Sequence, residues 1–143
     1  IAGCKNTEVP SGVTQMGERA FYGCSGLTSI TLPESVTEIG EFAFSDCSGL
    51  TSITLPESVT EIGEFAFSDC SGLTSITLSD RITKIGDGVF CGCSHLTSMV
   101  LPNSVAEVNS MAFVGCDNLT SITWKGKVYG SVNDFFDSGV KII

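Results

Sequence analysis

The chain has 143 residues, the length of one domain, and carries a formal net charge of -9. A negative charge of this size disfavours nucleic acids and anionic membrane surfaces as partners, because both attract basic proteins. His95 is the single histidine, so a metal site built from several histidines is excluded. No apolar run approaches the roughly 18 residues of a membrane-spanning helix. We therefore expect neither nucleic-acid binding nor membrane insertion.

An internal repeat of 23 residues dominates the sequence. The segment CSGLTSITLPESVTEIGEFAFSD at 24–46 recurs letter for letter at 47–69. A cysteine begins each of five successive units, namely Cys24, Cys47, Cys70, Cys93 and Cys116. A phenylalanine keeps the same step through the chain at Phe21, Phe44, Phe67, Phe90, Phe113 and Phe136.

This period predicts a single solenoid over residues 1–143 with about six repeats. We expect a partial N-terminal repeat over 1–23, regular repeats over 24–115, and a degenerate C-terminal repeat with a cap over 116–143. The cap is expected to end in a short strand over 139–143.

Several positions of the repeat are expected to face the interior. With the cysteine as position 1, positions 4, 7, 9, 13 and 16 hold apolar residues of similar volume in almost every unit, as a packed interior requires. The phenylalanines occupy position 21. Near the C-terminus, Val128 and Phe136 still fall on interior positions. Near the N-terminus, Cys4 and Thr7 replace the usual Leu and Ile.

Local patterns predict the secondary structure of each coil. The run L-T-S-I-T-L alternates apolar and hydroxyl side chains, which is typical of a strand with Ser and Thr outward. Such a strand in every unit predicts one parallel ladder. Position 17 is Gly in four units and Asn109 in a fifth, which favours a positive φ. The following EFAFSD is interpreted as one short helical turn.

The pattern C-x-x-L-x-x-I-x-L-P-x-S-V-x-x-I-G-x-x-A-F, over roughly residues 1–138, resembles the BspA-like leucine-rich repeats of bacterial and protozoan surface proteins. The resemblance implies an α/β, right-handed leucine-rich-repeat solenoid with one short parallel strand per coil and short helical turns on the convex side. It also implies a cell-surface or secreted location and a non-enzymatic role in adhesion or in binding an extracellular or host protein. The Trp124-Lys125 pair departs from the Leu-Pro of the pattern.

The cysteines admit two interpretations. Adjacent coils about 4.8 Å apart bring neighbouring cysteines within reach of a disulfide. A column of five cannot pair completely, however, so buried, reduced thiols are the prediction. Cys91 lies outside that column and is the expected partly exposed thiol. Cys91, Cys93 and His95 form C-x-C-x-H, which is not a usual zinc spacing, so we expect no metal and no cofactor.

Two kinds of surface stand out. Between Cys24 and Asp69 there are eight acidic residues and no basic one, which indicates a solvated negative face. The outward hydroxyls of the strands form the candidate partner surface. Its members are Ser29, Thr31, Ser52, Thr54, Ser75, Thr77 and Ser98.

Position 19 adds a second candidate partner surface. It holds Arg19, Phe42, Phe65 and Gly88 in successive units, a variety that argues against the interior. Phe42 and Phe65 are therefore either exposed neighbours forming a sticky patch or partly buried against the next coil, and both alternatives stay open.

Identical coils make surfaces rather than pockets, so we expect no enzyme. The leading hypothesis is a binding module for a protein partner. A structural spacer without its own ligand is the alternative, favoured by the two identical units, and recognition of carbohydrate or ice by the hydroxyl rows is a third hypothesis. We further expect any self-association to occur through the N-terminal coil, because an uncovered strand edge recruits partners.

Overall fold

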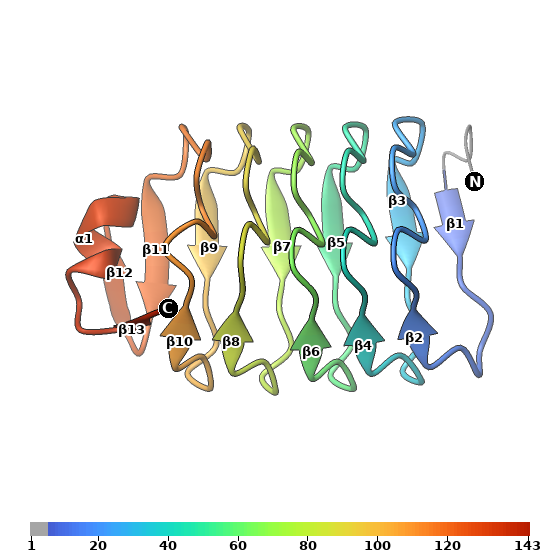
Figure 1. Cartoon of the computed structure of the whole chain (residues 1–143), viewed down its shortest axis with the longest axis horizontal. Coiled ribbons are helices and arrows are strands. Elements are labelled where there is room, and N and C mark those ends of the chain that lie inside the picture. The colour runs from blue at the N-terminus through green and yellow to red at the C-terminus, as the bar shows by residue number, and fades with distance from the viewer. Residues whose placement is uncertain (1–5) are drawn as a thin grey trace.

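In the computed structural model, which describes residues 6–143, the chain winds into a solenoid whose successive coils stand side by side (Figure 1). Each regular coil contains two short strands, not the single strand predicted. The first row consists of β1 (Asn6–Glu8), β3 (Ser29–Thr31), β5 (Ser52–Thr54), β7 (Ser75–Thr77), β9 (Ser98–Val100) and β11 (Ser121–Trp124). The second row consists of β2 (Gln15–Met16), β4 (Glu38–Ile39), β6 (Glu61–Ile62), β8 (Lys84–Ile85) and β10 (Glu107–Val108).

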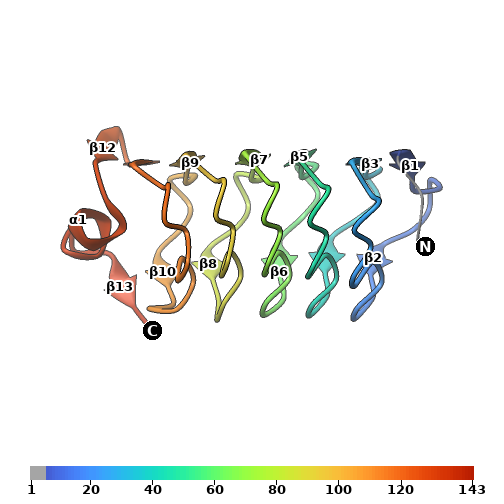
Figure 2. The same cartoon turned by 90° about the horizontal axis from the view of Figure 1, so that it is seen from above.

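The two rows lie on opposite sides of the coil, and the fold is mostly β rather than α/β (Figure 2). A strand of two residues contains a single alternation of outward and inward side chains. A single alternation is too short to be recognised as a strand from the periodicity of the sequence, so the second row was not predicted.

Parallel pairing joins residues 23 positions apart, as the repeat predicts. In the first row β1 pairs with β3, β5 with β7 and β9 with β11, so that Ser52 lies opposite Ser75 and Thr54 opposite Thr77. Within the described residues, β3 and β5, and likewise β7 and β9, are not joined by ladder pairing. The second row pairs as β2–β4–β6 and as β8–β10, with the same kind of break between β6 and β8.

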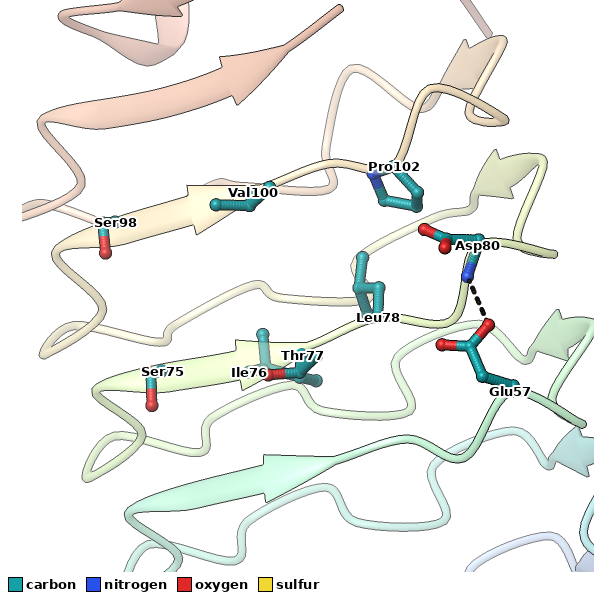
Figure 3. A pocket seen from close by; sticks show the side chains of 9 residues that line it. All are labelled: Glu57, Ser75, Ile76, Thr77, Leu78, Asp80, Ser98, Val100 and Pro102. Carbon is teal, nitrogen blue, oxygen red and sulfur yellow. Dashed lines mark hydrogen bonds between the residues drawn. The ribbon is translucent and has the colours of Figure 1, made fainter. Parts of the chain in front are cut away.

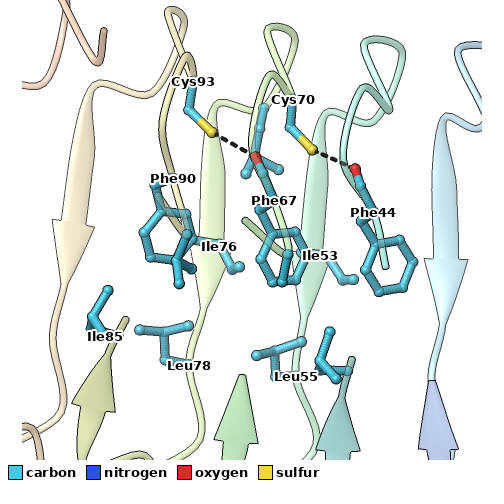
Figure 4. Close-up of a cluster of buried hydrophobic side chains, with 14 of the residues drawn as sticks. Phe44, Ile53, Leu55, Phe67, Cys70, Ile76, Leu78, Ile85, Phe90 and Cys93 are labelled. Atoms are coloured by element: carbon cyan, nitrogen blue, oxygen red, sulfur yellow. Dashed lines mark hydrogen bonds between the residues drawn. The ribbon is translucent and has the colours of Figure 1, made fainter. Parts of the chain in front are cut away.

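The core is a set of columns in which identical side chains stack along the solenoid axis. The rings of Phe44 and Phe67 lie 5.3 Å apart and nearly parallel, and Phe67 and Phe90 follow at 5.9 Å (Figure 4). The thiol of Cys70 donates a hydrogen bond to the carbonyl oxygen of Phe44 at 3.1 Å, and that of Cys93 donates to Phe67 at 3.2 Å. The predicted interior of the regular coils is therefore confirmed.

The predicted helical turn after position 17 is wrong. Ala43 N–H donates to the Gly40 carbonyl and Ser45 N–H to that of Phe42, three residues back in each case, which makes successive β-turns. Phe42 has a φ of 53° and Asp46 one of 60°, and a left-handed residue interrupts any helix. Within residues 6–143 the sole helix is α1, Val132–Phe136.

Two of the glycines at position 17, Gly40 and Gly63, serve close packing, and none of the four has the positive φ that was predicted. A Cβ built on Gly40 would lie 2.6 Å from the Met16 carbonyl oxygen, and one on Gly63 would lie 2.5 Å from the backbone nitrogen of Glu41. Neighbouring coils therefore approach too closely there for any side chain. Gly17 has open space at the same position.

The C-terminal repeat departs from the others after Trp124. Lys125 and Gly126, with φ of 49° and 77°, form a tight turn that leads into β12 (Lys127–Tyr129), which pairs antiparallel with β11. This reversal ends the 23-residue register.

As a consequence, the interior assignment of Val128 is wrong, and that of Phe136 is met only in part, because Phe136 packs against the core from a half-buried position. Val128 is 63% exposed, and Phe135 is fully buried while Phe136 is half-buried. The expected final strand does form, since β13 (Lys141–Ile142) pairs parallel with β10.

We predict that Phe67→Ala lowers the free energy of unfolding by about 3–5 kcal/mol, because the lost ring leaves a cavity between two stacked neighbours. Chemical denaturation measures this loss. The exposed Thr77→Ala is the control and should change stability by less than about 0.5 kcal/mol. A loss below about 1 kcal/mol in Phe67→Ala would show that the ring stack does not support the core.

A second pair of variants tests the close approach of the coils. Gly63→Ala should destabilise the protein by about 2 kcal/mol or more, because its methyl group meets backbone atoms that cannot yield. Gly17→Ala, at the same repeat position with open space around it, should leave stability within about 0.5 kcal/mol of the parent. Equal effects in the two variants, measured by thermal unfolding, would contradict this packing.

Candidate functional site

The hydroxyl side chains of the first strand row form one continuous exposed face. Ser29, Thr31, Ser52, Thr54, Ser75, Thr77 and Ser98 are all exposed, as predicted from the alternation. Between them the side chains of Ile30, Ile53 and Ile76 point into the core. We call this surface the strand face. At its C-terminal end Ser121 and Thr123 are half-buried.

Two open grooves cross the strand face where the ladder pairing is interrupted. The groove between β7 and β9 has a volume of about 500 Å³ and contains Ser75, Thr77, Ser98 and Val100, with Glu57 at its end (Figure 3). The Glu57 carboxylate accepts a hydrogen bond from the Asp80 backbone N–H at 3.4 Å.

The groove between β3 and β5 repeats this arrangement two coils earlier. It has a volume of about 310 Å³ and is lined by Ser29, Thr31, Ser52 and Thr54, with Glu34 at the place that Asp80 holds in the first groove. The first groove thus offers hydroxyl groups and the two carboxylates of Glu57 and Asp80 over an apolar floor, and the second offers hydroxyl groups and the one carboxylate of Glu34. Hydroxyl and carboxylate groups are hydrogen-bonding groups, so the grooves present donors and acceptors at the surface.

The acidic residues lie at exposed or half-buried positions, as expected for a negative face. Glu38 lies directly opposite Glu61 in the second strand row, and Lys84 lies opposite Glu107. Lys141 Nζ is 2.9 Å from the Glu107 carboxylate. Like charges opposite each other repel, so the Glu38–Glu61 pair is a site that a positive partner would stabilise.

Phe42 and Phe65 are half-buried and stacked on each other, with ring centroids 5.1 Å apart and an angle of 6°. This confirms the alternative of partial burial against a neighbouring coil. The Arg19 guanidinium lies 5.2 Å from the Phe42 ring centroid, and the Phe65 ring covers Gly88 so closely that a Cβ there would collide with it. We call Phe42 and Phe65 the outer aromatic stack.

The backbone of the outer aromatic stack is strained. Phe42 and Phe65 have φ of 53° and 54°, whereas Gly88 adopts 58° at the same repeat position. A left-handed conformation costs a non-glycine residue about 1–2 kcal/mol, a penalty that Gly88 avoids. Sequence reasoning missed this strain, although Gly88 at the same repeat position was a signal for it.

The cysteine column consists of thiols in the core. Cys47, Cys70, Cys93 and Cys116 are buried and outside any disulfide, as predicted. Burial raises the pKa of the Cys47 thiol to about 12 and also raises the pKa of Cys70. The thiols of Cys47 and Cys70 therefore stay protonated at neutral pH. Cys4 lies outside the described residues.

The side chains of the C-x-C-x-H motif do not point toward a common site. Cys93 points into the core, whereas His95 is exposed and its Nδ1 contacts the Ser71 carbonyl oxygen at 2.6 Å. Within residues 6–143, no three side chains of His, Cys, Asp or Glu are placed to share a metal ion. Over the same residues, no helix has the length and apolar character needed to cross a membrane.

Cys91 should be the first cysteine to react with an alkylating reagent in the folded protein. It is half-buried, while the column thiols are buried. Its pKa is raised by burial and by the nearby Asp69 carboxylate, so its reaction should accelerate as the pH rises. Mass spectrometry after mild alkylation tests this order. A bridge between Cys47 and Cys70, or earlier labelling of either, would contradict the assignment.

Comparison with known proteins places this geometry in a family. Residues 14–142 match the BspA type leucine-rich repeat region, with six copies. Among solved structures, the chain is similar to a leucine-rich repeat protein of T. pallidum, with 32% identity and a TM-score of 0.72. That match covers 85% of this chain and 71% of that one.

Two further solved structures support the assignment. A leucine-rich repeat protein of Bacteroides ovatus has 32% identity and a TM-score of 0.63, over 82% of this chain and 37% of that one. One of Eubacterium ventriosum has 27% identity and a TM-score of 0.78, over 84% and 32% respectively, so the chain spans only about a third of these two proteins. No curated protein matches the chain significantly. The chain belongs to the BspA-type leucine-rich repeat proteins.

Proposed function

We propose that this chain is a non-catalytic binding module that contacts a protein partner through its strand face. The observation that carries the proposal is the pair of equivalent grooves on that face, each with hydroxyl groups and a carboxylate. Extended surfaces built from repeats are how solenoid proteins bind other proteins.

The chemistry of the grooves favours a protein over a small ligand. Small-molecule sites enclose most of their ligand in an apolar cavity, whereas these grooves are open and lined by Ser and Thr. Serine and threonine have few rotatable bonds, so fixing them against a partner costs little conformational entropy. Two similar grooves two coils apart allow one partner to be held at two points.

A cell-surface or secreted location and a role in adhesion are part of the same proposal. Both come from the resemblance to BspA-like surface proteins, and the match to that family supports them. The expected self-association through the N-terminal coil, which begins at Ile1, stays a prediction, since residues 1–5 lie outside the described part.

A structural spacer is the second candidate function. The observation in its favour is the identity of the coils 24–46 and 47–69, because a duplicated unit adds length without adapting a contact. The spacer predicts no ligand for the isolated chain. Recognition of carbohydrate by the hydroxyl rows is a third candidate that the same experiment tests.

The experiment measures binding of the isolated chain to a panel of purified extracellular-matrix proteins and glycans. We expect saturable binding to a protein and at least tenfold weaker binding by Thr31→Arg/Thr77→Arg, because the arginines fill one groove each. Thr37→Arg/Thr83→Arg is the matched control, with the same charge change and the same spacing along the chain, outside the strand face. Equal losses of affinity in both variants would contradict binding through the strand face. Absence of binding to every member of the panel would favour the spacer. Binding to glycans alone would favour carbohydrate recognition.

A further inference from the structure

We propose that the outer aromatic stack, together with the carboxylates beside it, is a second docking surface that binds a basic and partly apolar protein segment. The stack lies on the connection from the second strand row to the next coil. This connection runs along the side of the solenoid opposite β3, β5 and β7 (Figures 1 and 2). The surface shares no residue with the strand face, so a negative result for one proposal leaves the other untouched.

The backbone brings carboxylate residues alongside each ring of the stack. Phe42 N–H donates to the Glu64 carbonyl at 3.0 Å, and Phe65 N–H donates to the Asp87 carbonyl at 2.9 Å. Glu41 directly precedes Phe42, and it is exposed, as is Glu64. Each ring is therefore flanked by an acidic residue of its own coil and by one of the next coil.

The surrounding charge selects a positive partner. From residue 24 to residue 69 there are eight acidic residues and no basic one. Arg19 lies at the N-terminal end of the stack and interacts with Glu18 at 3.6 Å as well as with the Phe42 ring. Further along the solenoid, Lys84 lines one hollow together with Glu61 and Glu64. A row of like charges is stabilised when a basic segment binds.

The core does not require the rings of the outer aromatic stack. The interior already has its own continuous phenylalanine column at position 21, and Gly88 holds the same backbone conformation as Phe42 and Phe65 without strain. Half-buried aromatic side chains are a favoured component of protein interfaces.

The geometry indicates how a partner would divide its contacts. The faces of the stacked rings are covered by each other, by Arg19 and by the Gly88 backbone, which leaves the ring edges exposed. Tyr22, which is 50% exposed, lies edge-on to Phe42 with 6.4 Å between centroids. Apolar side chains of a partner fit against these edges, while its lysines or arginines pair with the carboxylates.

The test is titration of the folded chain with an eight-residue peptide of alternating lysine and leucine, followed by calorimetry. An alternating glutamate–leucine peptide and an alternating lysine–serine peptide are the probes for charge and for apolar contact. We expect saturable binding of the lysine–leucine peptide, at least fivefold weaker binding of the lysine–serine peptide, and none of the glutamate–leucine peptide.

Three variants locate the binding. Phe42→Gly/Phe65→Gly removes the rings at positions whose φ suits glycine, so the fold persists, as a thermal unfolding scan verifies, and affinity should fall at least tenfold. Glu41→Gln/Glu64→Gln should reduce affinity at least threefold. Asp117→Asn/Asp137→Asn, with the same change of net charge elsewhere, should alter it less than twofold.

Three results would overturn the proposal. They are absence of peptide binding, full affinity in the glycine variant, and an equal loss in the two charge variants. The last of these would mean that the peptide responds to net charge alone.

Discussion

Phenylalanine rings stacked at one-coil spacing, each beside a cysteine thiol bonded to a neighbouring backbone carbonyl, fix the geometry of the whole solenoid. Each coil presents to the next coil the same side chains that it receives from the previous one. A residue that is too large or too small at an interior position therefore disturbs the packing against both the preceding and the following coil. This is why the interior positions tolerate only similar volumes, and why glycine is required where Gly40 and Gly63 meet neighbouring backbone.

The same constraint decides where function resides. The same apolar side chains fill the interior of every coil, so residue types vary mainly among the outward side chains. These outward side chains form rows along the solenoid rather than enclosed pockets. One row is the hydroxyl-rich strand face with its two grooves, and on the opposite side lies the outer aromatic stack with its acidic residues. A rigid solenoid keeps both rows in place without any reorganisation on binding, which reduces the entropic cost of association. The two surfaces differ in charge and in apolar character, and so favour different partners.

The sequence predicted the parts of the fold that depend on periodicity. Interior positions, the parallel register and the buried thiols all follow from a 23-residue step. The φ of 53° at Phe42 was not predictable, because it arises from the turn that fits the coil and not from the preference of phenylalanine. The exposure of Val128 was missed because the turn at Lys125 and Gly126 breaks the register. For the candidate site, exposure of the hydroxyls was predicted, but the grooves depend on which identical strands pair, which no repeat sequence specifies.

The central claim is that each coil is stabilised by its immediate neighbours alone, in one repeated register. Deletion of residues 47–69 tests it most directly, since the exact duplication leaves the sequence around the junction unchanged. The account predicts a shortened chain with the same β-type circular dichroism, a single cooperative unfolding transition and a denaturant dependence about one sixth smaller, in proportion to the surface removed. A shortened chain that fails to fold, or that unfolds in separate steps, would show that contacts beyond the nearest coil hold the structure together.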